Sequence, residues 1–356
     1  MLDSSFATSS PLRLLSLVLL ISGLLAATAC SGLLVTHKKV QVPQLLVPLA
    51  EASKGHLVNE INRLAALRSI HGRVDIQFED TSFAEAGIAE KYRQADGTIT
   101  LQQPGKVYLI IQVPFIAKDI AQMTSDGESF RVAVLLGEEK YRRFVKGTNN
   151  ANYEKLDLGA RKADPEKHKT MNENETVSAL SNLRPQHLTD ALMIHPIADA
   201  SETGVAYSES EFFQEEVDSR PQAKKGTRVV RGYYLLEEFS QPRAGEARLL
   251  RRFWFDRVGT VHLARLQTFD DHGLLITDVA YWDERPFGEK GLAKLPSRIE
   301  ITKPHDQYKL SITYQAPATV ELDREYKPEA FVLENKWQLP EVDLDARQNK
   351  KMTVHQ

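Results

Sequence analysis

The apolar positions of the first folded segment follow a helical spacing. Between residues 48 and 69 they recur every three or four residues, which predicts an amphipathic helix with one apolar stripe. That stripe consists of Leu57, Ile61, Leu64 and Leu67. Gly72 follows, and we expect the helix to have ended there, because glycine commonly stands just beyond a helix.

The apolar period then changes to two, which is the spacing of half-buried strands. Val74, Ile76 and Phe78 alternate with polar residues, so they predict a strand with one buried face. Ala-Asp-Gly at residues 95–97 predicts a turn, and residues 98–102 alternate again.

One strand differs from the others in being apolar on both faces. Residues 107–113 contain a single polar side chain, Gln112, and we expect this strand to be covered on both sides. Asp126-Gly127 is a strong signal for a tight hairpin turn. Further strands are predicted at residues 130–136, 141–145, 228–239, 247–257, 261–269, 274–284, 297–302, 308–314 and 330–334.

Three stretches lack this alternation. Residues 147–175 are polar and predict a long loop, and residues 176–193 predict a helical region. Residues 202–226 predict another loop, although they include aromatic side chains. About a dozen strands in meander order, with helices before and between them, predict a mainly β (α+β) fold with one highly curved antiparallel sheet or open barrel.

The N-terminal residues have the pattern of an export signal. An apolar run at residues 14–25 precedes small residues at positions 26–29 and then Cys30, the only cysteine of the chain. The run is shorter than the roughly 20 residues that a membrane-spanning helix needs. We interpret Cys30 as a lipidation site, because a thiol at the first mature position can carry lipid. The alternative is an ordinary secretory signal that happens to end at a cysteine.

This segment resembles the lipobox of bacterial lipoproteins, although Ala27 stands where leucine is commonest. Ser31 follows the cysteine, and in the enterobacterial pattern this implies an outer-membrane location, with the protein facing the periplasm. The expected segments are a signal peptide at residues 1–29, a lipidated tether at 30–45, a folded domain at 46–336 and a C-terminal tail at 337–356.

Composition and charge narrow the possible functions. The chain has 45 Lys and Arg against 48 Asp and Glu, and the two signs are interspersed, so no basic stripe suggests nucleic acid as a partner. One cysteine cannot form an intramolecular disulfide. Burial and strand pairing must therefore stabilise the fold.

Catalytic signatures are absent from the sequence. The metalloprotease, nucleophile-elbow, P-loop and dinucleotide-binding motifs do not occur. Asp270, Asp271 and His272 combine metal-ligating residue types, but neighbours in a hairpin point in different directions and Gly273 explains a turn. We therefore expect no metal site and no enzymatic activity.

Several stretches together carry a family resemblance. They are Leu57–Leu64, Ile70–Val74, Asp96–Val107, Ser125–Phe130 and Leu295–Ile301. The chain resembles the LolA/LolB-like superfamily of outer-membrane lipoprotein carriers and receptors, in particular members with their own lipobox. One position departs from the pattern: Gln103 stands where the superfamily often has Arg or Lys before Pro-Gly. In the soluble carrier, an arginine is thought to help hold the lid closed.

The resemblance implies an open half-barrel of about 11 strands whose apolar concave face is covered by helices. Such a cavity takes up the acyl chains of lipids or lipoproteins. The lid and cavity residues expected to bind them are Leu57, Ile61, Leu64, Leu67, Val107, Leu109, Ile111 and Val113, although apolar residues in such patterns are more often plain core than ligand contacts. Phe115 and Ile116 are expected to form a membrane-contact loop, although they could equally pack under the sheet.

The resemblance implies a protein that traffics or inserts lipids or lipoproteins at the outer membrane. Its expected partners are the membrane, through the lipid on Cys30, the acyl chains it binds, and a periplasmic carrier or an envelope complex. No cofactor is expected beyond the covalent lipid and a bound acyl chain. The alternative is a structural or interaction lipoprotein that uses the same fold, with a filled interior, to scaffold an envelope complex.

Overall fold

The structure is a computed structural model. It describes residues 42–81, 90–91, 94–114, 118–137, 139–149, 151, 153, 183–197, 204–220, 222–240, 246–291 and 293–354. The chain divides into two compact units, Met1–Gln44 and Leu45–Gln356. Only residues 42–44 of the first unit are described, so the fold below is that of the second. No helix among the described residues is long and apolar enough to cross a membrane.

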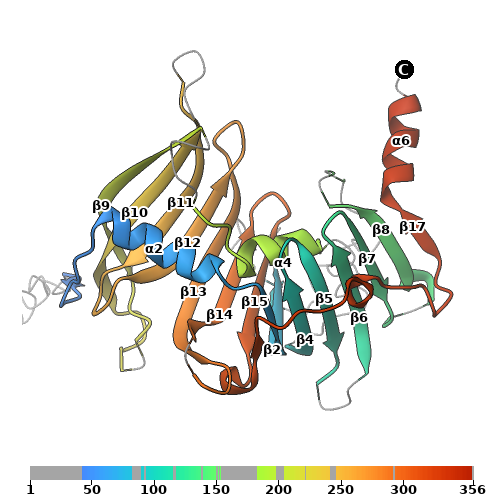
Figure 1. Cartoon of the computed structure of the whole chain (residues 1–356), viewed down its shortest axis with the longest axis horizontal. Coiled ribbons are helices and arrows are strands. Elements are labelled where there is room, and N and C mark those ends of the chain that lie inside the picture. Colours follow the sequence, from blue (N-terminus) through green and yellow to red (C-terminus); the bar gives the residue numbers. More distant parts are fainter. Residues whose placement is uncertain are drawn as a thin grey trace, which may run out of the picture. The chain divides into compact units, whose positions relative to one another are not determined.

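Most of the second unit is one large, curved and unclosed sheet, which confirms the predicted fold class (Figure 1). One half of the sheet is an antiparallel meander from the N-terminal part of the chain. It consists of β2 (Ser69–Asp80), β4 (Ala95–Gln102), β5 (Lys106–Gln112), β6 (Asp119–Asp126), β7 (Ser129–Val134) and β8 (Arg143–Thr148).

A second antiparallel meander forms the other half. It consists of β9 (Val205–Val217), β10 (Arg228–Ser240), β11 (Leu249–Asp256), β12 (His262–Phe269), β13 (Leu275–Phe287), β14 (Ala293–Lys303) and β15 (Tyr308–Tyr314). Strand β15 pairs with β2, with Ile312 opposite Ile76, so strands distant in sequence join the two meanders.

Short elements complete the unit. Strand β17 (Glu341–Asp343) pairs with β8 in parallel, while β3 (Glu90–Lys91) and β16 (Glu321–Leu322) pair with β2. The remaining elements are β1 (Gln44–Leu45), α2 (Lys54–Ala65), α4 (Pro185–Leu192), α6 (Leu344–Val354) and the 3-10 turns η3 (Glu139–Tyr141), η4 (Pro317–Thr319) and η5 (Pro328–Phe331).

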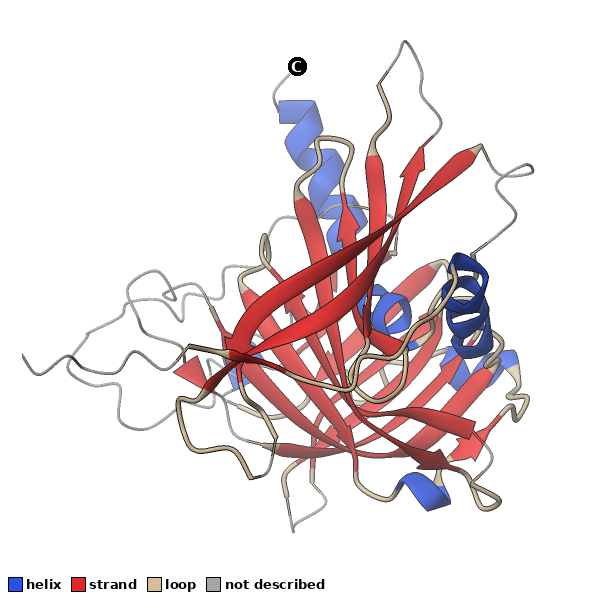
Figure 2. Cartoon of the chain, turned by 90° about the vertical axis from the view of Figure 1, so that its left-hand side faces the viewer, coloured by secondary structure: helices blue, strands red, loops and turns tan. Residues whose placement is uncertain are grey.

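Helices α2 and α4 cover one face of the sheet, which we call the inner face (Figure 2). Alternate strand residues point to this face and form the main hydrophobic core, for example Tyr234 and Leu236 on β10 and Val279 and Tyr281 on β13. The opposite face is called the outer face. It carries smaller apolar clusters and many ion pairs.

Two glycines predicted to lie in breaks are instead inside strands. Gly72 lies in β2, where a Cβ would meet Val320 Cγ2 at 2.8 Å. Gly97 lies in β4 rather than in a turn, and a Cβ there would come within 2.7 Å of Ile76 Cδ1. The close approach of neighbouring chain, and not a turn, explains why glycine stands at these positions.

Two predicted segments have another structure. The loop expected at residues 202–226 contains β9, a mostly exposed strand of 13 residues with no regular apolar alternation to reveal it. The strand expected at 330–334 is wrong, because Pro328 begins the 3-10 turn η5 there. The predicted strand number of about eleven is therefore too low, since β9 and the short strands add to it.

Other predictions are confirmed in full or in part. The two-sided cover expected for β5 is only partly present: α4 packs on its buried inner face, whereas its outer side chains stay half-buried although η5 contacts the strand. The Asp126-Gly127 turn connects β6 to β7, and Gly127 has a φ of 104°, which favours glycine. The helix predicted at 48–69 is α2, although it is shorter than expected, spanning 54–65.

Candidate functional site

Helix α2 places an apolar stripe on the inner face of the sheet. It begins after Ser53, whose hydroxyl accepts a hydrogen bond from the His56 N–H at 3.4 Å. Leu57 and Ile61 are fully buried. Leu64 and Leu67 are half-buried and pack against the same core from the C-terminal end of the helix. The predicted stripe is therefore the face that α2 buries, and its last two residues lie at the margin of the cover.

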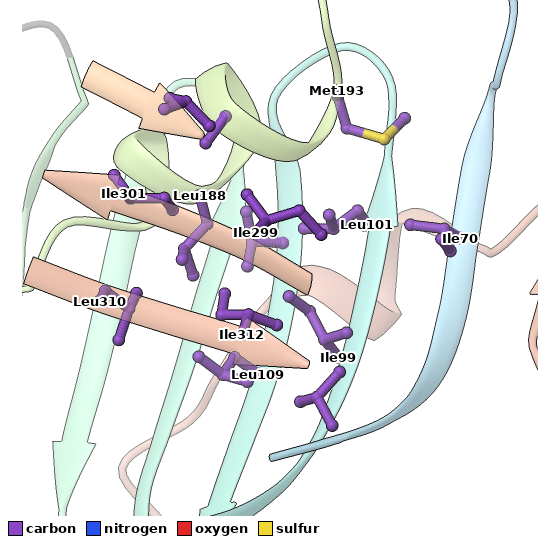
Figure 3. Close-up of a cluster of buried hydrophobic side chains, with 14 of the residues drawn as sticks. Ile70, Ile99, Leu101, Leu109, Leu188, Met193, Ile299, Ile301, Leu310 and Ile312 are labelled. Carbon is purple, nitrogen blue, oxygen red and sulfur yellow. The ribbon is translucent and has the colours of Figure 1, made fainter. Parts of the chain in front are cut away.

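Helix α4 is the other part of this cover. It begins at Pro185, which needs no hydrogen-bond acceptor for its nitrogen at this position. Leu188 and Ala191 are fully buried, and Figure 3 shows Leu188 pointing from α4 toward the strand residues Ile299 and Ile312. These helix residues are not among the predicted site residues, although the spacing of Leu188, Ala191 and Leu192 is itself helical.

The predicted strand residues lie under α4 and not under α2. Val107, Leu109 and Ile111 are buried on β5, and Val113 just beyond it is half-buried. Helix α4 packs on β5, β6 and β14, whereas α2 packs on β12 of the other meander. All eight predicted residues thus belong to one apolar core, but they form two parts of it beneath two different helices.

Several side-chain hydrogen bonds hold the two helices in place. The Asn62 side chain of α2 accepts a hydrogen bond from the Ile197 N–H at 2.9 Å and donates to the Ile197 carbonyl at 3.3 Å. Ile197 follows α4, so this pair joins the two parts of the cover. Gln103 Nε2 donates to the carbonyls of Ala65 and Leu67 at 3.1 and 3.0 Å. It therefore satisfies carbonyl groups that the end of α2 leaves without helical partners.

Buried polar side chains connect α4 to the strands. The Tyr281 hydroxyl donates to the Ala191 carbonyl at 2.9 Å, and burial raises the pKa of this tyrosine. The His187 ring Nδ1 lies 2.5 Å from the Tyr308 hydroxyl. Burial, reinforced by the positive charges of Lys303 and Arg184, holds the pKa of His187 well below its usual value. His187 is therefore neutral around pH 7.

A small apolar pocket remains where the two helices meet. It measures about 30 Å³, little more than the room of one water molecule. Its lining includes Leu64 and Leu67 from the α2 side, Leu192 and Ile194 from the α4 side, and Leu295 and Ile299 of β14. Between the described residues of the two helices, this pocket has no room for a longer apolar ligand, which would need the helices to separate.

Three predicted site residues lie outside the described residues. These are the lipidation candidate Cys30 and the loop residues Phe115 and Ile116. The chain on either side of the loop is described, and the Val113 N–H donates to the Lys118 carbonyl at 2.9 Å. This hydrogen bond joins the two ends of the β5–β6 connection that carries Phe115 and Ile116.

No family model matches the chain, and no curated protein matches it in sequence. Similar solved structures do exist. One is a LolA superfamily protein from Nitrosomonas europaea, with 10% identity, a TM-score of 0.37, and coverage of 77% of this chain and 96% of that chain. A DUF1329 family protein from Desulfovibrio piger has 11% identity, a TM-score of 0.38 and coverage of 78% and 94%.

A third similar structure, from Vibrio parahaemolyticus, is named as an outer membrane lipoprotein-sorting protein domain. It has 11% identity and a TM-score of 0.34, and the match covers 79% of this chain and 97% of that chain. The solved structures similar to this chain thus include a protein of the LolA superfamily, the superfamily that the sequence resembles.

Proposed function

We propose that this protein binds acyl chains of lipids or lipoproteins between its helical cover and the inner face of the sheet. The observation that carries the proposal is the construction of the cover. Two separate short helices close a continuous apolar surface, and an apolar pocket of about 30 Å³ lies at their junction. Each helix can move without breaking the strand ladder beneath it.

The free energy gained by burying an acyl chain is large enough to offset the hydrogen bonds that hold the helical cover closed. Burial gains about 0.8 kcal/mol per methylene, so an acyl chain with about twelve methylenes gains about 10 kcal/mol before ordering costs. The hydrogen bonds of the cover, such as the Asn62–Ile197 pair, the bonds of Gln103, the Tyr281–Ala191 bond and the bond from Arg63 to the Lys294 carbonyl at 2.7 Å, contribute about 1 kcal/mol each. An acyl chain can therefore displace such contacts, although the apolar helix faces must find new partners.

The proposal extends to location and partners. Lipid on Cys30 anchors the protein in the outer membrane, facing the periplasm, where it receives or inserts lipids or lipoproteins delivered by a periplasmic carrier or an envelope complex. Phe115 and Ile116 enter the membrane surface from the β5–β6 connection. In the unlipidated protein, Phe115→Glu should then reduce association with liposomes, as measured by flotation; unchanged flotation would remove this role.

One observation favours the alternative function, a structural lipoprotein that scaffolds an envelope complex. Leu57, Ile61 and Leu188 are fully buried, so side chains fill the interior around the described core as they would in a protein without cargo. The two functions differ in whether the cover opens, and this can be measured directly.

The test uses residues 31–356, purified gently and examined by native mass spectrometry and organic extraction. A stoichiometric acyl-containing adduct, or uptake of a fluorescent fatty acid, supports the carrier. Leu64→Gln together with Leu67→Gln at the pocket should reduce uptake about tenfold or more, because each adds a polar group to the acyl path. Leu135→Gln, at an equally half-buried site beside the outer cluster of β7 and β8, is the matched control. A clean apoprotein without uptake would favour the scaffold.

A further inference from the structure

A second concave site lies on the outer face, away from the helical cover. It is a groove of about 550 Å³ across β9–β15, a volume typical of small-molecule sites. On β10 and β13, Tyr233 and Asp278 line the groove, whereas their neighbours Tyr234 and Val279 belong to the inner core. The alternation of strand side chains therefore places most of the groove lining on the face opposite the proposed acyl site, although Tyr281 of the inner core lines both.

The charged side chains of the groove are paired with one another. Arg231 bonds Glu216 at 2.6 Å and also bonds Asp256, and Tyr233 donates to Glu216 at 2.9 Å. Arg265 binds the Asp278 carboxylate through two nitrogens. Of the described lining residues, every Arg and Lys contacts a carboxylate, including Arg220 with Asp218 and Lys309 with Glu300.

This pairing determines which ligands the groove suits. A phosphate would have to displace carboxylates from the arginines, and a metal ion would have to displace arginines from the carboxylates. Hydroxyl groups need neither exchange, because a paired carboxylate keeps free lone pairs and a paired guanidinium keeps free N–H groups. The groove therefore offers fixed donors and acceptors side by side with nearly balanced charge, which suits a neutral ligand rich in hydroxyl groups.

An aromatic platform lies at the rim. The Trp282 side chain is 37% exposed, and the Arg298 guanidinium lies 5.3 Å from its ring centroid. The backbone beside it is irregular: Asp283 has a φ of 55°, and its carbonyl accepts a bond from the Ser297 hydroxyl at 2.8 Å. The ladder pairs Trp282 with Arg298 and Glu284 with Pro296, so the register continues across Asp283 and the irregularity is confined to the positive φ of that residue. Residues in this backbone conformation cluster at functional sites.

We propose that this groove binds a sugar, with Trp282 stacking on the C–H face of a ring and the Arg265–Asp278 and Arg231–Glu216 pairs bonding its hydroxyls. The sugar can belong to a free oligosaccharide or to the headgroup of a lipid. We consider a lipid headgroup because a narrow pocket leads from the groove to α2. This pocket is lined by His262, Trp282 and Asp283, which also line the groove, and it reaches Glu60 and Leu64 of α2. A lipid tail directed toward the cover would then leave its headgroup in the groove.

The test follows tryptophan fluorescence and heat of binding with the full-length protein in dodecylphosphocholine. A phosphocholine detergent is needed, because glucoside and maltoside detergents would themselves supply sugar. Maltotetraose, cellotetraose and chitotetraose probe free oligosaccharides, and dodecyl maltoside probes a sugar headgroup on an acyl tail. Saturable binding of any of these supports the proposal, and binding of dodecyl maltoside alone identifies the headgroup as the source.

Substitutions locate the binding. Trp282→Ala should weaken it about tenfold, whereas Trp337→Ala, at a tryptophan outside the groove, should not. Asp278→Asn keeps the side-chain shape and should weaken binding as well, so the proposal stays testable if Trp282→Ala fails to fold. Fatty-acid uptake by Trp282→Ala should be unchanged, which separates this site from the proposed acyl site.

Three results would overturn the proposal. The first is that none of the four sugars binds at millimolar concentration. The second is that binding is equally strong in Trp282→Ala and Asp278→Asn. The third is that inorganic phosphate binds in the groove with an affinity that falls with salt, which would show that the ion pairs open to receive an anion.

Discussion

At the scale of single residues, His187 of helix α4 makes the folding stability of the protein depend on pH. It lies on α4 beside the Tyr308 hydroxyl, and Lys303 and Arg184 are the charged groups that act on it. Its pKa is lowered in the folded protein, so between that value and the unfolded value of about 6.5 the unfolded chain binds more protons. Folding stability therefore decreases as pH falls below about 6.5 and levels off below the folded pKa.

This gives a prediction about acid stability. Urea unfolding should show a lower midpoint at pH 5 than at pH 7.5, and His187→Gln should reduce that difference because it removes the titrating ring. His305→Gln changes an exposed histidine and serves as the control. An equal loss of stability in His187→Gln and in the unsubstituted protein would show that other groups cause it.

The role of Gln103 is an example of a contact that could not be predicted from the sequence. The sequence marks it as a departure from the superfamily pattern, and no role follows from that. The structure gives it one, because its amide donates to the Ala65 carbonyl at the end of α2 and to the Leu67 carbonyl just beyond it. Such a contact joins positions distant in sequence through a side chain, and no local periodicity encodes it.

At the scale of elements, the contact between α2 and the segment after α4 determines how easily the cover opens. Asn62 makes both hydrogen bonds of this contact with Ile197. Asn62→Ala should leave a buried N–H and carbonyl without a partner, which costs about 1–3 kcal/mol locally. Opening of the cover should therefore become about 5- to 150-fold more frequent.

Hydrogen exchange measures this opening. In Asn62→Ala, the amides of α4 and of residues 193–197 should exchange faster, while those of β4 and β5 keep their protection. Asn59→Ala, an exposed asparagine on the same helix, is the matched control and should leave exchange unchanged. Faster exchange across the whole sheet would mean that Asn62 supports global stability and not the cover.

Elements differed in how well the sequence predicted them. Strands with alternating side chains, such as β2 and β14, were predicted because one face is buried and the other is not. Strand β9 was missed, because pairing with β10 rather than an apolar face holds it. The eight predicted lid and cavity residues lie in or against the core, but which helix covers which strand depends on tertiary packing. Their role as ligand contacts stays a prediction.

At the scale of the whole unit, the pairing of β2 with β15 joins the two meanders. Ile312 is fully buried on β15 opposite Ile76. Ile312→Ala should cost about 2–5 kcal/mol of unfolding free energy, as other buried truncations do. Since both meanders share one core, we expect a single unfolding transition at lower urea, followed by circular dichroism and tryptophan fluorescence.

The neighbouring Ser311 points to the other face and supplies the control. Ser311→Ala should change stability by less than about 0.5 kcal/mol. Separate transitions for the two meanders in Ile312→Ala would show that they fold independently and that the β2–β15 pairing adds little.

The same pairing has a consequence for how the protein is made. A chain that folds from its N-terminus can complete the β2–β8 meander early, but the second edge of β2 stays open until Tyr308–Tyr314 pairs with it. An open strand edge can pair with strands of other chains, so the partly folded chain is prone to aggregation for that time. Premature termination before Tyr314 therefore does more than shorten the sheet at its margin: it exposes a central strand, and such a product should be degraded or aggregate.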